Sequence, residues 1–205
     1  LNNLDAFESV EPITKEKSYK TAGHEWKPID PASPRSEEQI ARSMMGHTYN
    51  HIGEIIDYQT PLKNVQSDEA GKIDLLSRNE AEERVYILEL KVPRTEEKTK
   101  KETLLHCILE IDTYSRILDA KKLLKDFGLP SETAVRKAAL VYEDSHPYTD
   151  FDDPHIKKLM KALGVDLFVL NHDNQIVEAH CLQSKTRHRH ASCRAGQPIP
   201  LALQH

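Results

Sequence analysis

Residues 85–93, VYILELKVP, place two charged side chains inside an otherwise apolar run. The β-branched and aromatic residues of this stretch favour a buried strand. Glu89 and Lys91 are two positions apart and therefore share one face of that strand, opposite Leu90. A buried carboxylate or ammonium needs a partner of opposite charge or a metal ion. The stretch is therefore either an edge strand with a solvated face or part of a chemical site.

The preceding segment, GKIDLL at residues 71–76, carries Asp74 within another apolar run. A polar turn at 78–84 connects the two segments, so they are expected to pair as a hairpin. Asp74, Glu89 and Lys91 then meet on one face, near the end of the sheet. Two neighbouring carboxylates repel unless a cation neutralises them, and oxygen ligands suit Mg²⁺ or Mn²⁺. An adjacent ammonium can stabilise charge on phosphate oxygens, so the pattern predicts phosphodiester hydrolysis.

The rest of the chain predicts an α/β fold. We expect a three-layer sandwich with a central mixed β-sheet. Hydrophobic periodicity predicts helices over 37–52, 99–128 and 153–164, and strands over 55–64, 71–77, 85–92, 134–144, 165–171 and 175–183.

The composition along the chain predicts three segments. Residues 1–35 include a proline-rich stretch and are expected to form an extended arm on the domain, with Trp26 as an anchor. Residues 36–183 are expected to form the folded domain. Residues 184–205 are basic, have no hydrophobic period and are expected to form a flexible tail.

Charge and composition narrow the classes of function. The chain has 205 residues, a formal net charge of -5 and a pI of about 6.1, which argue against tight, non-specific coating of DNA. An acidic catalytic site needs only a local basic rim, so a nuclease stays compatible with this charge. No apolar run is long enough for a membrane span, and the N-terminus lacks the pattern of a secretory signal. Three cysteines without a disulfide pattern predict a reducing, cytoplasmic location.

The segments GKIDLL and VYILELK, with a helix before and after the strands, resemble the core of the PD-(D/E)XK nuclease superfamily. The resemblance covers about residues 36 to 145 and implies a restriction-endonuclease-like fold and divalent-metal-dependent cleavage of DNA. It implies that Asp74, Glu89 and the main-chain carbonyl of Leu90 bind Mg²⁺ or Mn²⁺, and that Lys91 is the catalytic lysine. Ile73 stands where the family name expects Pro.

Further positions can be matched to the same family. Many members carry an acidic residue on the first helix, which corresponds to Glu38. The alternatives at this position are Glu37, His51 and Glu54. The recombination-nuclease branch has Gln-x-x-x-Tyr after the third strand, where this chain has Glu110 and Tyr114. Glu110 departs from that pattern, so it is either a supporting carboxylate or an ordinary polar residue of the helix.

Three functions are compatible with these observations. The first is a metal-dependent nuclease, including an endonuclease, acting on DNA, with RNA as an alternative substrate. The second is a catalytically inactive nuclease-fold module for binding or assembly, which the acidic charge balance favours. The third is a hydrolase of other phosphodiesters or nucleotides. No membrane partner is expected, and a homodimer stays open.

Overall fold

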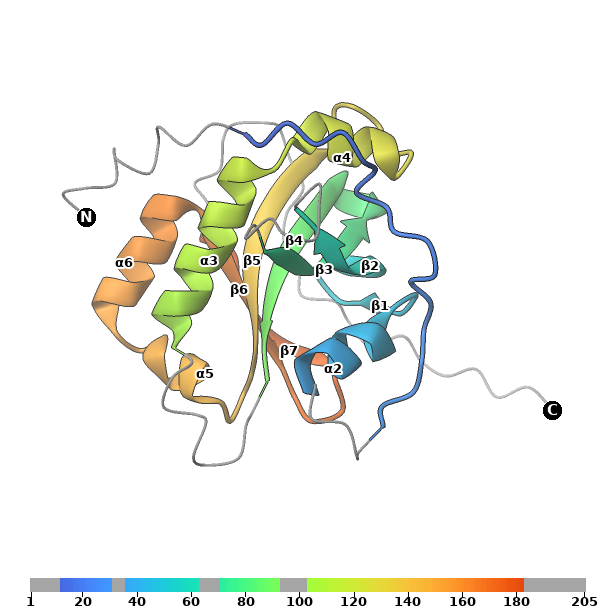
Figure 1. Cartoon of the computed structure of the whole chain (residues 1–205). Helices are drawn as coiled ribbons and strands as arrows, with labels where there is room; N and C mark the ends of the chain where they lie inside the picture. Colours follow the sequence, from blue (N-terminus) through green and yellow to red (C-terminus); the bar gives the residue numbers. More distant parts are fainter. Residues whose placement is uncertain (1–11, 31–35, 63–70, 93–102, 183–205) are drawn as a thin grey trace.

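The computed structural model describes residues 12–30, 36–62, 71–92 and 103–182. Within these residues, seven strands form one sheet in which each strand lies next to its neighbour in sequence (Figure 1). The predicted tail at 184–205 lies outside the described residues, as do residues 1–11 and 31–35 of the predicted arm. No helix in the described part of the chain is long and apolar enough to cross a membrane.

The sheet is mixed. Strands β1 to β4 are antiparallel, β4, β5 and β6 are parallel, and β7 returns antiparallel to β6. This confirms the predicted α/β class with a central mixed sheet. The strands are β1 (Thr48–Tyr49), β2 (Gly53–Pro61), β3 (Lys72–Asn79), β4 (Arg84–Lys91), β5 (Ala134–Tyr142), β6 (Val165–Leu170) and β7 (Ile176–His180).

Helices lie on both faces of the sheet. Helix α2 contacts β2, β3 and β4, whereas α3 contacts β3, β4 and β5 and also packs against α5 and α6 (Figure 1). The helices are α2 (Ser36–Met44), α3 (Leu104–Ile117), α4 (Ala120–Asp126), α5 (His146–Asp150) and α6 (Pro154–Leu163), and a 3₁₀ turn spans Glu80–Glu82.

Strand β4 divides its side chains between two cores. Val85 and Ile87 pack in the core that includes α3 residues, which we call the α3-side core. Tyr86, Leu88 and Leu90 pack in the core that includes α2 residues, which we call the α2-side core. This alternation places Glu89 and Lys91 on the α3 side, as the period of two in the sequence predicts.

The helix predicted over 37–52 is wrong beyond residue 44. Helix α2 ends at Met44, and residues 48–49 form the short strand β1 against β2. The reason is Gly46, which has φ of +75 and donates its N–H to the carbonyl of Ile55. A left-handed glycine that closes a turn ends a helix whatever the periodicity beyond it.

The helix predicted over 99–128 is divided into α3 and α4. Asp119 caps the second helix, because its side chain accepts a hydrogen bond from the N–H of Lys122. The residue before it, Leu118, is extended, with ψ of 127. Capping by an Asp side chain starts a new helix and interrupts the old one. Leu105 on α3 is 43% exposed, and α5 was not predicted.

The described part of the arm is attached by Tyr19. This side chain is fully buried, and its hydroxyl accepts a hydrogen bond from the N–H of Asp119. The N–H of Tyr19 donates to Asp126. Trp26 is 52% exposed, so its prediction as the anchor was wrong.

Candidate active site

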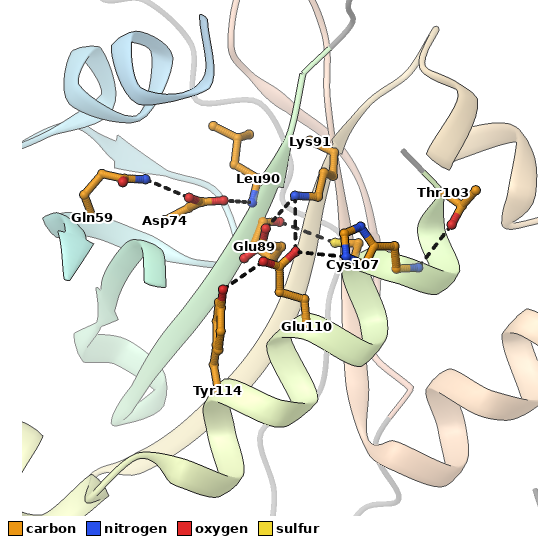
Figure 2. Close-up of polar contacts among 10 residues, drawn as sticks. Gln59, Asp74, Glu89, Leu90, Lys91, Thr103, Cys107, Glu110 and Tyr114 are labelled. Carbon is orange, nitrogen blue, oxygen red and sulfur yellow. Dashed lines mark hydrogen bonds and ion pairs between the residues drawn. The ribbon is translucent and has the colours of Figure 1, made fainter. Parts of the chain in front are cut away.

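The site lies where β3 and β4 separate. Their ladder of paired residues runs to Leu75 opposite Leu88. Beyond that pair, the N–H of Leu90 donates to Oδ2 of Asp74 at 2.9 Å, so a side chain takes the place of a backbone acceptor (Figure 2). The N–H and C=O of one strand residue face the same neighbouring strand. The carbonyl oxygen of Leu90 therefore also faces β3, on the side of Asp74.

Asp74 is held at both carboxylate oxygens. Besides the contact to Leu90, the amide Nε2 of Gln59 on β2 donates to Oδ1 at 2.8 Å. Burial raises the pKa of Asp74 from 3.8 to about 6, although the N–H of Leu90 and the ammonium of Lys91 oppose the change. A small part of the Asp74 surface stays exposed. The Asp74 carboxyl therefore loses its proton at a higher pH, closer to neutral, than an ordinary aspartate does.

Glu89 and Lys91 form a buried ion pair. Only 3% of Glu89 and 6% of Lys91 is exposed, and Nζ of Lys91 lies 2.5 Å from Oε1 of Glu89. Within the described residues, the second oxygen, Oε2, is buried and receives no hydrogen-bond donor. Burial and the nearby charge of Asp74 raise the pKa of Glu89 well above its ordinary value. The site therefore contains a buried acceptor that a cation or a proton would satisfy.

Lys91 keeps its proton. Burial alone disfavours the ammonium, but the charge of Glu89 outweighs that effect and raises the pKa of Lys91. Glu110 on α3 is a second partner, with Oε2 at 3.6 Å from Nζ. A lysine held in this way acts as a fixed positive charge, not as a general base.

Glu110 and Tyr114 contact the site from α3. The hydroxyl of Tyr114 donates to Oε1 of Glu110 at 2.8 Å (Figure 2). Burial favours the neutral form of Glu110, but the charge of Lys91 and the hydrogen bond from Tyr114 outweigh it and lower the pKa of Glu110. Glu110 is therefore a second carboxylate beside the ammonium of Lys91.

Gly71 allows the close approach of Tyr114. A Cβ atom at position 71 would lie 2.1 Å from the Tyr114 hydroxyl oxygen, a distance that real side chains do not tolerate. The glycine just before β3 thus lets α3 pack its tyrosine against the strand that carries Asp74. Gly71, the first residue of the GKIDLL segment, therefore leaves room for the Tyr114 ring.

Among the first-helix candidates, Glu37 and Glu38 affect the pKa values of different residues. The charge of Glu37 contributes to the raised pKa of Asp74, whereas that of Glu38 contributes to the raised pKa of Tyr58. Glu37 is therefore the better supported first-helix candidate. His51 and Glu54 lie at the opposite end of β3, where they neighbour Asn79 and Arg78.

The donor set fits a small divalent cation. In residues 12–30, 36–62, 71–92 and 103–182, no group of three or more His, Cys, Asp or Glu side chains is arranged to hold a metal. Mg²⁺ is commonly bound by one or two carboxylates, with waters and substrate phosphates completing its shell. Asp74, the buried Oε2 of Glu89 and the Leu90 carbonyl are oxygen donors of this kind.

Two neighbours of the site were not predicted from the sequence. Gln59 contacts Asp74, and the thiol of Cys107 donates to the main-chain carbonyl of Glu89 at 3.8 Å. Burial raises the pKa of Cys107, so the thiol stays protonated and packs as a small apolar group. No motif marks either residue, because both are placed by contacts between distant segments.

Comparison of the chain with protein-family models, with curated proteins and with solved structures found no match.

Proposed function

We propose that this chain is a divalent-metal-dependent nuclease that hydrolyses phosphodiester bonds of DNA. The observation that carries the proposal is the convergence of Asp74, Glu89 and Lys91 where β3 and β4 separate. Two carboxylates, a main-chain carbonyl and a lysine that stays charged are the groups needed to bind a cation beside a phosphate. A cytoplasmic location and a homodimer stay predictions.

We also propose that the fold is a three-layer sandwich of the restriction-endonuclease-like type, as the resemblance to PD-(D/E)XK nucleases implies. Helices on both faces of a mixed sheet support it. So does the order of elements, in which an antiparallel β2-β3-β4 unit is followed by α3 and the parallel strand β5.

In this proposal, Asp74, Glu89 and the carbonyl of Leu90 hold Mg²⁺ or Mn²⁺. When bound, the cation supplies Lewis-acid activation of the phosphodiester and of the attacking water. Lys91 positions the water and stabilises charge on the phosphate oxygens, and its raised pKa keeps it charged throughout the neutral range. Glu110 and Tyr114 fix the lysine from the helix side.

The test is cleavage of linear and circular DNA, and of RNA, by the full chain with Mg²⁺ or Mn²⁺. We expect Asp74→Ala and Lys91→Ala to abolish cleavage while circular dichroism shows a folded protein. Lys121→Ala, which changes an exposed lysine on α4, is the matched control and should cleave like the wild type. If the wild-type chain cleaves none of these substrates with either metal, the nuclease proposal fails.

A second candidate is a catalytically inactive nuclease-fold module for binding or assembly. The observation in its favour is that Lys91 already neutralises Glu89, and that the described residues contain no group of three metal-ligating side chains. Metal titration separates the candidates. A nuclease binds Mn²⁺ through Asp74 and is stabilised by it, whereas the module shows neither binding nor stabilisation.

A further inference from the structure

Gln59 lies on β2 directly beside Asp74. The register pairs Tyr58 with Leu75 and Thr60 with Ile73, so residues 59 and 74 stand opposite each other. The Gln59 amide donates to Oδ1 of Asp74 at 2.8 Å, and the Leu90 N–H donates to Oδ2 at 2.9 Å. One carboxylate on β3 is therefore held from β2 on one side and from β4 on the other. Figure 2 shows this arrangement.

The backbone of Gln59 departs from strand geometry. Its φ is +49, in the left-handed region that side chains other than Gly rarely adopt. The other described non-glycine residues with positive φ, His51, Glu83 and Asn174, lie in turns or at the end of the 3₁₀ turn. Among the non-glycine residues that the structure describes, Gln59 alone has this conformation inside a strand.

The partner strand is irregular at the same place. Ile73 packs in the α3-side core and Leu75 in the α2-side core, although residues two apart in a regular strand share a face. The break in alternation falls at Asp74. Side chains of an extended strand stand roughly perpendicular to the sheet, so the contact of the Asp74 carboxylate with the backbone N–H of Leu90 on the next strand accompanies such a local departure. Unfavourable backbone conformations of this kind are concentrated at functional sites.

We propose that Gln59 is a positioning residue for Asp74. Its amide fixes the carboxylate so that the lone pairs left free by Gln59 and Leu90 face the divalent cation. The inference rests on the proposed function, because it assigns a role within the same metal site. A role in the fold alone is the competing explanation, since any buried carboxylate requires donors.

The test is binding of Mn²⁺ to the full metal-free chain, measured from the electron paramagnetic resonance signal of free Mn²⁺. Gln59→Leu removes the donor and keeps a side chain at the left-handed position, whereas Gln59→Gly removes the donor and suits that backbone. We expect both variants to raise the Kd for Mn²⁺ about tenfold, the usual effect of losing a partner of a metal ligand. Cleavage by both variants should recover when Mn²⁺ is raised by the same factor, with KM for DNA unchanged.

The matched control is Glu83→Gly. It also places glycine at a left-handed position, with φ of +52, but on an exposed residue remote from Asp74. This control should bind Mn²⁺ like the wild type.

Mn²⁺ binding by Gln59→Gly with the wild-type Kd would overturn the inference, whatever Gln59→Leu does, because the donor would then be dispensable. That result would leave the nuclease proposal intact as long as the wild-type chain binds Mn²⁺ and cleaves DNA. If the wild-type chain binds no Mn²⁺, both proposals fail together, because Gln59 would have no ligand to position.

Discussion

Replacing Asp74 with Asn should stabilise the metal-free protein at neutral pH. The folded pKa of Asp74 is about 6, above its ordinary value of 3.8, because burial disfavours the carboxylate. The folded state therefore holds this proton more tightly than the unfolded chain does. The stability that the proton supplies is complete below about pH 4 and is lost as the pH rises through about 6. Asn carries no charge at any of these pH values and avoids that loss.

The magnitude follows from the pKa. A rise from 3.8 to about 6 corresponds to about 3 kcal/mol, since a tenfold change in acidity is about 1.4 kcal/mol. The partial exposure of Asp74 makes this an upper value. Asn can accept from only one of its two donors, Gln59 or Leu90, and losing the other hydrogen bond costs about 1 kcal/mol. The net gain in the free energy of unfolding is therefore about 1 to 2 kcal/mol above pH 6, with abolished cleavage.

The measurement is urea unfolding with EDTA present, at intervals between about pH 4 and pH 8, where titration of Asp74 affects stability. The stability curves should cross, with the wild type more stable at the acidic end. Asp112→Asn is the matched control, because Asp112 is 1% exposed but is paired with Lys137 and Arg116. Removing that charge should destabilise the protein. A variant Asp74→Asn that is less stable than the wild type at pH 8 would refute the reasoning.

Three further outcomes follow from contacts in the structure. Lys91→Met leaves the Glu89 carboxylate buried and unpaired, so urea unfolding should show a loss of about 3 kcal/mol near pH 8. The loss should become smaller as the pH falls, because the raised pKa of Glu89 favours its neutral form. Gly71→Ala should lower the free energy of unfolding by about 1 to 3 kcal/mol through its clash with Tyr114. In a double-mutant cycle, Tyr114→Ala should remove most of this loss, and simple additivity would contradict the contact. Tyr19→Ala should cost about 3 kcal/mol or more, whereas Trp26→Ala should stay within about 0.5 kcal/mol, and equal effects would refute Tyr19 as the anchor.

Site residues on a strand could be predicted from the sequence, because the period of two determines on which face of the sheet each side chain lies. Glu89 and Lys91 share a side of β4 because residues two apart must do so, and the hairpin brings Asp74 beside them. The position around a helix is harder to predict. Glu37 and Glu38 are about 100° apart on α2, and which of them turns toward Asp74 depends on packing that the sequence does not encode locally.

Element ends were missed where one residue outweighs a periodic pattern. Gly46 ends α2 although His47 and His51 continue its helical spacing, and Asp119 interrupts a long helical run by capping α4. The conformation of Gln59 had no local signal at all, because it depends on Asp74, fifteen residues away in the sequence.

The separation of β3 from β4 has a mechanical consequence. Strand β4 loses β3 as a partner after Leu88 but stays paired with β5 as far as Lys91, which faces Val141. The last residues of β4 are therefore paired with β5 along one edge, whereas along the other edge they have no ladder partner on β3 and the Leu90 N–H binds the Asp74 side chain. Pairing with β5 already holds the backbone at the end of β4 in place. A ligand that binds along the edge facing β3 therefore does not have to order this part of the chain. Substitution of Asp74 or Glu89 should therefore leave the backbone pairing between β4 and β5 intact.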